Sequence, residues 1–324
     1  MDIQNHLRRG SIVVDRSKIS NCFTALVVAL TLLAANFLSP LSVSAADNPP
    51  RRLIVCSTTQ TADFSRQVVG DRWEVQSILK PGTDPHLYQI PQADARLVAK
   101  ADLCVENGWH LEGKDWMRTL AEDENKPLVT CTDGIAPLEL SDDGQKVKDP
   151  HAWFSPQNAA RYVQNIASAV IELDPDNAAE HHARTQLYLA QLRALHGWCL
   201  QQFNSLPADQ RVLVTNHDAF NYFCKQYNMK AASPVGWSTG SEVGGGLTPE
   251  RRKQTVNSIR KFGVRSIFVE TTIDGKVMRQ IAQDAGVRIG GKLYSDSMGT
   301  PGSAGETYLG MMRENVLTIV QGLK

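Results

Sequence analysis

Short apolar runs alternate with amphipathic segments through residues 53–131. The runs lie at 53–56, 73–79, 103–105 and 128–131, and the segments with helical spacing lie at 61–69, 91–100 and 111–122. This alternation predicts a parallel sheet flanked by helices.

Two helices are predicted next. Ser155 and Pro156 are typical of an N-cap followed by proline in the first helical position, which predicts a helix from there to about residue 173. The sequence Asp174-Pro175-Asp176 ends it. From there to Phe203 no proline intervenes, and one helical face carries Tyr188, Leu192, Leu195, Cys199 and Phe203. A single helix of roughly 40 Å is predicted, long enough to span two lobes.

The alternation resumes after residue 206, with apolar runs at 212–214 and 266–269 and helical patterns at 218–228, from 248, at 275–285 and at 305–322. We therefore expect an α/β protein of two lobes, each with a parallel sheet flanked by helices, joined by one long rigid helix. The expected parts are a signal peptide (1–46), an N-terminal lobe (47–175), the linking helix (176–205) and a C-terminal lobe (206–324).

The N-terminus has the pattern of a secretory signal peptide: basic residues up to Lys18, an apolar core at 25–35, and small residues before a cleavage point after Ala45 or Ala46. The alternative is a signal anchor, although Asn36, Ser39 and Pro40 interrupt the apolar stretch. Cys22 precedes the apolar core and is not expected to carry a lipid. We expect a protein outside the cytoplasm, in the periplasm or its equivalent.

Charge and cysteine content narrow the function further. The chain has 34 basic and 34 acidic residues; residues 1–46 hold four and two of these, which leaves 30 and 32. No basic stripe indicates nucleic acid binding, and no second long apolar segment indicates a membrane span. Five cysteines follow residue 46: Cys56, Cys104, Cys131, Cys199 and Cys224. Their odd number and the lack of a CxxC pair argue against a disulfide framework and a thiolate metal site, although disulfides among them stay open. Buried free thiols are expected at Cys56, Cys104 and Cys131, which lie in apolar strand-like runs.

The tripeptide Asp-Pro-His occurs twice, ending at His86 and at His151, in a chain with only eight histidines. Proline fixes its own φ and extends the preceding residue, so each imidazole follows a stiff turn. A preorganised imidazole suits a metal ion, and Asp84 and Asp149 are candidates to orient the rings. Two ordinary turns are the alternative.

Three further candidates follow strand-like runs: His217, Glu270 and Asp296. Ligands of α/β proteins collect at the carboxyl ends of strands, so these loops could complete one site. Three imidazoles and one carboxylate suit Zn²⁺ or Mn²⁺. The adjacent His181 and His182 diverge on a helix and are expected at the surface, and whether His110 or Glu270 supports the ligands stays open.

Six motifs together resemble the solute-binding proteins of zinc- and manganese-importing ABC transporters, the cluster A-I metal receptors. They are KPGTDPH ending at His86, ENGWHLE at 106–112, DPHAW at 149–153, TNHDAF at 215–220, IFVE at 267–270 and GKLYSDSMG at 291–299. The resemblance covers essentially the whole chain after the signal. It implies two α/β lobes joined by a rigid helix, with one metal held by His86, His151, His217 and Asp296.

The resemblance leaves the metal open. Residues 133–148 lack the histidine-rich loop of some zinc receptors, whereas His217 stands where many manganese receptors have glutamate. We expect a monomeric, non-enzymatic receptor that captures one divalent ion (manganese or zinc, with iron as a further option) as cargo. Its partners would be a membrane permease and a separate ATPase, with no nucleic acid. The alternatives are a secreted zinc hydrolase and a metal-binding surface adhesin.

Overall fold

The N-terminal half of the chain is built on a parallel sheet. The computed structural model describes residues 51–142, 145–234 and 248–324, so the predicted signal peptide lies outside the described residues. The sheet has the order β2-β1-β3-β4, with all neighbours parallel. Its strands are β1 (Leu53–Cys56), β2 (Glu74–Ser77), β3 (Leu103–Glu106) and β4 (Leu128–Thr130).

The predicted helices lie between these strands, namely α2 (Thr59–Val69), α3 (Gln92–Val98) and α4 (Trp116–Asp123). Helix α4 begins later than the apolar spacing at 111–122 predicts. The backbone before it has positive φ at Trp109, His110, Lys114 and Asp115, with values between 50° and 60°. Left-handed residues cannot continue an α-helix, so this prediction was wrong by a full turn.

A polar antiparallel hairpin, β5 (Glu139–Asp142) with β6 (Gln145–Lys148), precedes the second Asp-Pro-His and was not predicted. Helix α5 (Pro156–Leu173) then begins as expected, because the Ser155 side chain accepts a hydrogen bond from the N–H of Asn158 and Pro156 occupies the first turn.

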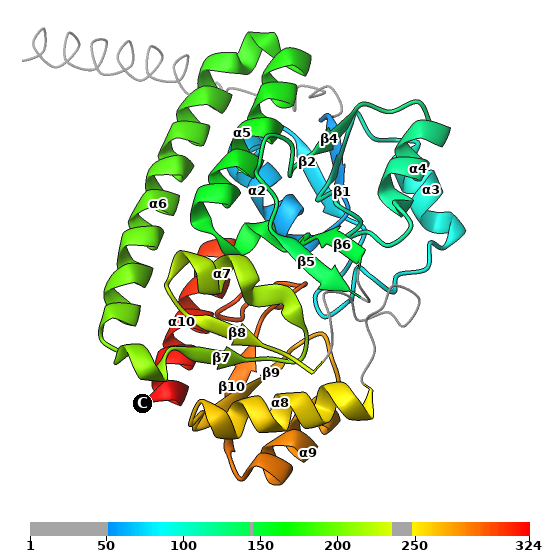
Figure 1. Cartoon of the computed structure of the whole chain (residues 1–324). Helices are drawn as coiled ribbons and strands as arrows, with labels where there is room; N and C mark the ends of the chain where they lie inside the picture. The colour runs from blue at the N-terminus through cyan, green and yellow to red at the C-terminus, as the bar shows by residue number, and fades with distance from the viewer. Residues whose placement is uncertain (1–50, 143–144, 235–247) are drawn as a thin grey trace, which may run out of the picture. The chain divides into compact units, whose positions relative to one another are not determined.

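The predicted long helix is confirmed as α6 (Ala178–Asn204), which has 27 residues. All five apolar positions of its predicted face are buried. It packs against α5 and α2 of the N-terminal half and against α10 (Tyr308–Leu323) of the C-terminal half. Figure 1 shows it passing alongside both halves, and residues 51–324 form one compact unit.

The C-terminal half, residues 206–324, has two parallel strand pairs among the described residues. Strand β7 (Val212–Val214) pairs with β8 (Lys230–Ala232), and β9 (Ser266–Glu270) pairs with β10 (Arg288–Leu293). The remaining helices are α7 (Asn221–Gln226), α8 (Pro249–Lys261) and α9 (Lys276–Ala285). The predicted α/β class, with parallel sheets flanked by helices and one long helix, is confirmed.

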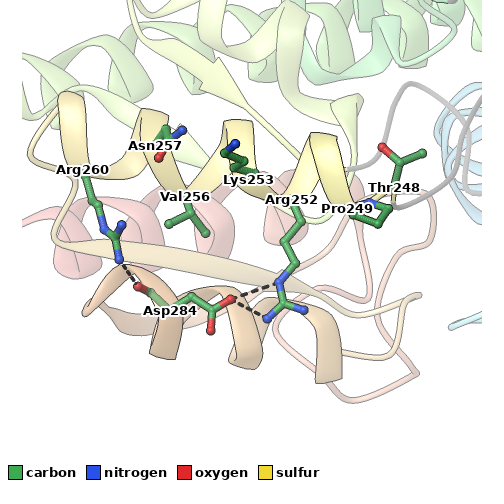
Figure 2. A pocket seen from close by; sticks show the side chains of 8 residues that line it. All are labelled: Thr248, Pro249, Arg252, Lys253, Val256, Asn257, Arg260 and Asp284. Atoms are coloured by element: carbon green, nitrogen blue, oxygen red, sulfur yellow. Dashed lines mark hydrogen bonds and ion pairs between the residues drawn. The ribbon is translucent and has the colours of Figure 1, made fainter.

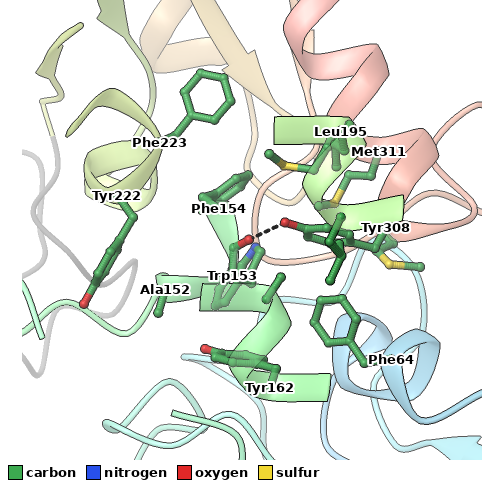
Figure 3. Close-up of a cluster of buried hydrophobic side chains, with 14 of the residues drawn as sticks. Phe64, Ala152, Trp153, Phe154, Tyr162, Leu195, Tyr222, Phe223, Tyr308 and Met311 are labelled. Carbon is green, nitrogen blue, oxygen red and sulfur yellow. Dashed lines mark hydrogen bonds between the residues drawn. The ribbon is translucent and has the colours of Figure 1, made fainter. Parts of the chain in front are cut away.

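One buried cluster joins side chains from both halves. Phe64 of α2 and Tyr162 of α5 pack in the same cluster as Leu195 of α6 and Tyr308 of α10 (Figure 3). The hydroxyl of Tyr308 donates a hydrogen bond to the carbonyl oxygen of Trp153 at 2.7 Å, which satisfies the polar end of a fully buried ring. The core therefore reaches residues directly beside His151.

The five cysteines of the described chain are buried free thiols, as expected for Cys56, Cys104 and Cys131. Burial raises the pKa of Cys56 and of Cys104 to about 12. A thiol with such a pKa carries almost no thiolate at neutral pH, so these side chains act as small apolar groups.

Candidate metal centre

The two Asp-Pro-His turns place His86 and His151 by the same local bond. In each turn the aspartate Oδ1 accepts the backbone N–H of the histidine two residues later, at 2.9 Å for Asp84 and 3.0 Å for Asp149. This is the short-range bond that makes aspartate favourable in turns, and proline stiffens the residue between. The tripeptide itself therefore determines how each histidine leaves its turn.

The second turn adds a side-chain contact. Asp149 Oδ1 also lies 2.8 Å from Nδ1 of His151, and both side chains are fully buried. An imidazole held at Nδ1 by a carboxylate presents Nε2 as the metal-binding atom. Asn221 donates to Asp149 Oδ2 at 3.1 Å, and the Tyr222 hydroxyl donates to the Asp149 carbonyl oxygen at 3.1 Å.

His217 follows β7 and is held by Glu270, the last residue of β9. Glu270 Oε1 accepts the backbone N–H of His217 at 3.0 Å, and Oε2 lies 2.7 Å from its Nδ1. The backbone N–H of Glu270 donates to the side chain of Asn216 at 2.8 Å, which ties the ends of the two strands together. His217 therefore has the same carboxylate–imidazole arrangement as His151.

The structure brings His86, His151, His217 and Asp296 together, with one ligand atom of each within 4.8 Å of the others. The Asp296 carboxylate lies 3.2 Å from Nε2 of His217, 3.4 Å from that of His151 and 3.9 Å from that of His86. Donors around one tetrahedral ion with bonds of about 2.1 Å are roughly 3.4 Å apart. The four side chains have the spacing of a single metal site.

Burial separates the converging side chains from water. The side chains of all four residues are at most 1% exposed. Lone pairs that converge away from water cost free energy unless a donor or a cation compensates them. A divalent ion bound by these atoms would supply that compensation.

The site electrostatics act in opposite directions on His86 and His217. Burial lowers the pKa of His86 to about 3, so this ring is neutral and ready to bind. Burial acts in the same direction on His217, but the carboxylates of Glu270 and Asp296 overcome it and raise its pKa well above the ordinary value. For Asp296, burial opposes ionisation, and the neighbouring imidazoles, His217 first, nevertheless lower its pKa. The Asp296 carboxylate is therefore anionic, the form in which a carboxylate can bind a metal ion.

Two other histidines lie outside this group. His110 is 70% exposed in its side chain and pairs with Asp115 at 3.0 Å, so it supports none of the four. The prediction that His181 lies at the surface was wrong, because its side chain is fully buried and Nε2 lies 3.0 Å from Asp174. Trp73 donates to the same carboxylate at 3.0 Å. This cluster connects the start of α6 to the N-terminal half.

Sequence reasoning missed the residues that hold the ligand loops. The sequence pattern does not predict the contacts that Asn221 and Tyr222 make with Asp149, because nothing in α7 indicates contact with that residue. Thr59 and Gln60, which bind the Asp296 segment, follow closely after β1. The rule that ligands collect after strands would have included these two.

The described residues also form a cavity of about 610 Å³ between α8 and α9 (Figure 2). Two of the basic side chains that line it bond to Asp284. Arg252 pairs with the Asp284 carboxylate, and Arg260 donates to the Asp284 carbonyl oxygen. None of the four converging ligands lines it. Separately, among the described residues no helix combines the length and apolar character needed to cross a membrane.

Comparison with known proteins agrees with this geometry. A family model described as ZnuA, zinc-uptake complex component A periplasmic, matches residues 54–322. The metal ABC transporter substrate-binding lipoprotein SsaB of Streptococcus sanguinis is 34% identical over 287 residues, covering 86% of this chain and 92% of the relative. The manganese ABC transporter substrate-binding lipoprotein scaA of Streptococcus gordonii is 34% identical over 288 residues, with coverage of 86% and 92%.

Solved structures share the fold. The periplasmic zinc binding protein TroA from Treponema pallidum aligns with a TM-score of 0.78 at 30% identity, covering 84% of this chain and 99% of that one. The Mn-bound periplasmic metal binding protein from Candidatus Liberibacter asiaticus aligns with a TM-score of 0.75 at 27% identity, covering 85% and 100%.

Proposed function

The chain belongs to the ZnuA family of metal-uptake binding proteins, and we propose that it captures one manganese or zinc ion outside the cytoplasm and delivers it to an ABC permease. The convergence of His86, His151, His217 and Asp296 within 4.8 Å is the observation that carries this proposal. Four buried protein ligands suit capture of an ion as cargo, because they leave little room for a reacting substrate.

The family is one of transport binding proteins, not enzymes, which confirms that prediction. The geometry also argues against the zinc hydrolase alternative. Glu270, the candidate base, contacts Nδ1 and the backbone N–H of His217, on the far side of that ring from the converging Nε2 atoms. A general base must reach the proton that it removes.

The identity of the ion is the finer part of the proposal. The Irving-Williams order of affinities favours Zn²⁺ over Mn²⁺ for almost any site, so purified protein alone gives a biased answer. Three nitrogen donors favour zinc, while a carboxylate with both oxygens turned inward provides the oxygen donors that manganese prefers. Uptake of manganese, zinc and iron, measured in parallel in cells with and without the protein, identifies the cargo.

Ligand replacement tests the site itself. We expect one tightly bound ion per purified wild-type chain by elemental mass spectrometry, and none in a His86→Ala/His151→Ala double variant. A matched control, His110→Ala/His182→Ala, removes two exposed histidines and should retain full binding. Full stoichiometric binding by the first variant would refute the proposed ligands.

Family membership places the protein outside the cytoplasm as a component of a metal ABC transporter. We further propose a signal peptide at 1–46, lobes at 47–175 and 206–324 linked by 176–205, and a monomeric receptor that meets a permease served by a separate ATPase. The mass of the exported chain tests cleavage after Ala45 or Ala46, and light scattering tests the monomer. An adhesin role is a separate hypothesis; growth rescue of a deletion strain by manganese or zinc indicates import.

A further inference from the structure

The segment that carries Asp296 belongs to the C-terminal half but is hydrogen-bonded to the N-terminal half on both sides of the ligand. Met298 donates its backbone N–H to Oγ1 of Thr59 at 2.9 Å. Ser295 accepts, at its carbonyl oxygen, a hydrogen bond from the Gln60 side-chain amide at 3.1 Å. Asp296 therefore lies between two points of attachment to the first turn of α2.

These two bonds form one continuous chain. The Thr59 hydroxyl, which accepts from Met298, donates to Oε1 of Gln60 at 3.0 Å, and the amide nitrogen of Gln60 completes the path to Ser295. All four residues are buried, with exposures between 0% and 8%. Water does not compete for these groups, and a buried donor or acceptor left without its partner is costly.

A third bond ties the same segment to the loop of the first ligand. The backbone N–H of Gly82 donates to Oγ of Ser297 at 2.8 Å. Gly82 lies four residues before His86 in the stiff KPGTDPH turn. The position of Asp296 is thus coupled to the loop of His86 as well as to α2.

The attachments orient the carboxylate. Oδ1 of Asp296 faces Nε2 of His151 at 3.4 Å, while Oδ2 faces Nε2 of His217 at 3.2 Å and of His86 at 3.9 Å. Both oxygens point toward the imidazoles, so the group can bind an ion through both. A loop fixed at one end only would leave the carboxylate free to rotate and bind through one oxygen.

We propose that Thr59 and Gln60 are positioning residues that hold the Asp296 carboxylate with both oxygens toward the ion and so favour retention of manganese. The inference rests on the proposed function of metal capture. Manganese needs more than four donors and prefers oxygen, whereas four donors satisfy zinc. Loss of the hydrogen-bond chain should therefore weaken manganese binding more than zinc binding.

The test compares purified wild-type protein with Thr59→Val, Gln60→Met and the double variant. Thr119→Val and Gln280→Met serve as matched controls, because these side chains are exposed and each bonds to a residue only four positions away in the sequence. We measure the dissociation rates of Mn²⁺ and Zn²⁺, the Mn²⁺ electron paramagnetic resonance spectrum and the thermal unfolding of the metal-free chains.

In the double variant we expect Mn²⁺ to dissociate about tenfold faster, as is typical when the groups behind a ligand are removed, with a smaller change for Zn²⁺ and an altered Mn²⁺ spectrum. Thr59→Ser keeps the hydroxyl and should restore wild-type rates. Ser297→Ala removes the bond from Gly82 and the bond that the Ser297 hydroxyl donates to the carbonyl oxygen of Met298, while Thr59 and Gln60 stay in place. This smaller perturbation should speed Mn²⁺ release severalfold.

The measurements distinguish failure of the proposed metal capture from failure of the positioning role of Thr59 and Gln60. Absence of metal binding by the wild-type chain would overturn the proposed function. Normal wild-type binding, with Mn²⁺ dissociation unchanged in the folded single variants and in Ser297→Ala, would overturn the positioning role alone. Equal losses of Mn²⁺ and Zn²⁺ affinity would also overturn it, because the carboxylate orientation would then not discriminate between the ions.

Discussion

The two Asp-Pro-His turns have the same sequence but different surroundings. Around His151 the aspartate, proline and histidine are all buried, and Asp149 contacts the ring, Asn221 and Tyr222. Around His86 the aspartate is only half-buried and its Oδ1 accepts the backbone N–H. The tripeptide specifies the turn, whereas the side chains that contact the aspartate and the imidazole ring come from distant elements that pack against that turn.

One loop contacts both turns, in different ways. The amide of Asn107 donates to the carbonyl oxygen of Pro150 at 3.0 Å, and Asn107 is itself fixed by Glu112, which accepts its backbone N–H at 2.6 Å. Gly113 lies against the first turn so closely that a Cβ there would be 2.5 Å from the carbonyl oxygen of His86. This loop thus contacts the second turn through a hydrogen bond and the first through close backbone packing.

Replacing the two aspartates should separate the turns most clearly. Asp149→Ala removes the carboxylate at Nδ1 of His151 and the acceptor for Asn221, so we expect metal affinity to fall about 100-fold. Asp84→Ala should cost about tenfold or less, because the hydrogen bond to His86 there orients the backbone. Competition titration against a chelator measures both, with exposed Asp176→Ala as control. Equal losses would mean that the surroundings of the turns do not matter.

The imidazoles should also differ in how they link binding to pH. His86 is neutral because burial lowers its pKa, but the raised pKa of His217 means that a proton must leave before a metal binds. We expect affinity to fall about tenfold per pH unit as the pH is lowered below that pKa, with about one proton released per ion. Calorimetry in two buffers of different ionisation enthalpy counts the proton.

The raised pKa of His217 also affects the folding stability of the metal-free chain, and this contribution favours low pH, whereas metal binding favours high pH. Without metal, the raised pKa of His217 adds stability that is complete below the ordinary histidine pKa and is lost as the pH rises through the folded-state value. If the calorimetry shows that a metal ion binds at neutral pH without releasing a proton, His217 is not charged in the metal-free chain.

Crowding the first turn should have an intermediate effect. In Gly113→Ala the new methyl group must displace the backbone of His86, so we expect about fivefold weaker metal binding and about 1–3 kcal/mol lower stability. Gly197→Ala in α6 is the matched control, since nothing lies within 4 Å of its added Cβ. Denaturant unfolding and metal titration measure the two effects. Normal binding in Gly113→Ala would show that the first turn tolerates displacement.

The smallest effect is expected at Tyr222. Its hydroxyl donates to the carbonyl oxygen of Asp149 and accepts the backbone N–H of Leu138 at 2.8 Å. Tyr222→Phe should lower stability by about 1 kcal/mol and metal affinity about twofold to threefold, because Asp149 keeps its other contacts. If Tyr222→Phe lowers metal affinity as much as Asp149→Ala does, the Tyr222 hydroxyl, rather than the Asp149 carboxylate, is the main group that positions His151.

Periodicity and local turn chemistry predicted the strand–helix order, the long helix and the residues that converge. These features depend on short-range rules: a cap at Ser155, a stripe from Tyr188 to Phe203, and an Asx bond in each tripeptide. The error at His181 has a tertiary cause, because Asp174 and Trp73 form a buried cluster with that residue. The error at α4 is local, because a left-handed backbone at Lys114 and Asp115 delays the start of the helix.

The supporting residues could not be predicted for the same reason. The contact from Asn221 to Asp149 spans 72 positions, and the contact from Gln60 to Ser295 spans 235. No pattern within a window of sequence contains such pairs. The rule that ligands collect after strands and the motif resemblance both linked distant loops, but they identified the converging residues and not the side chains that support them.

The shared core around α6 has a consequence for how an ion leaves. Phe64, Trp153 and Tyr308 belong to one buried cluster that extends across both halves. A wide rotation of one half against the other would expose large aromatic surfaces to water, at roughly 25 cal/mol for each Å². We therefore expect the ion to leave through small displacements of the loops while the core stays nearly unchanged. For the same reason, thermal unfolding should be a single cooperative transition, with no intermediate in which one half alone remains folded.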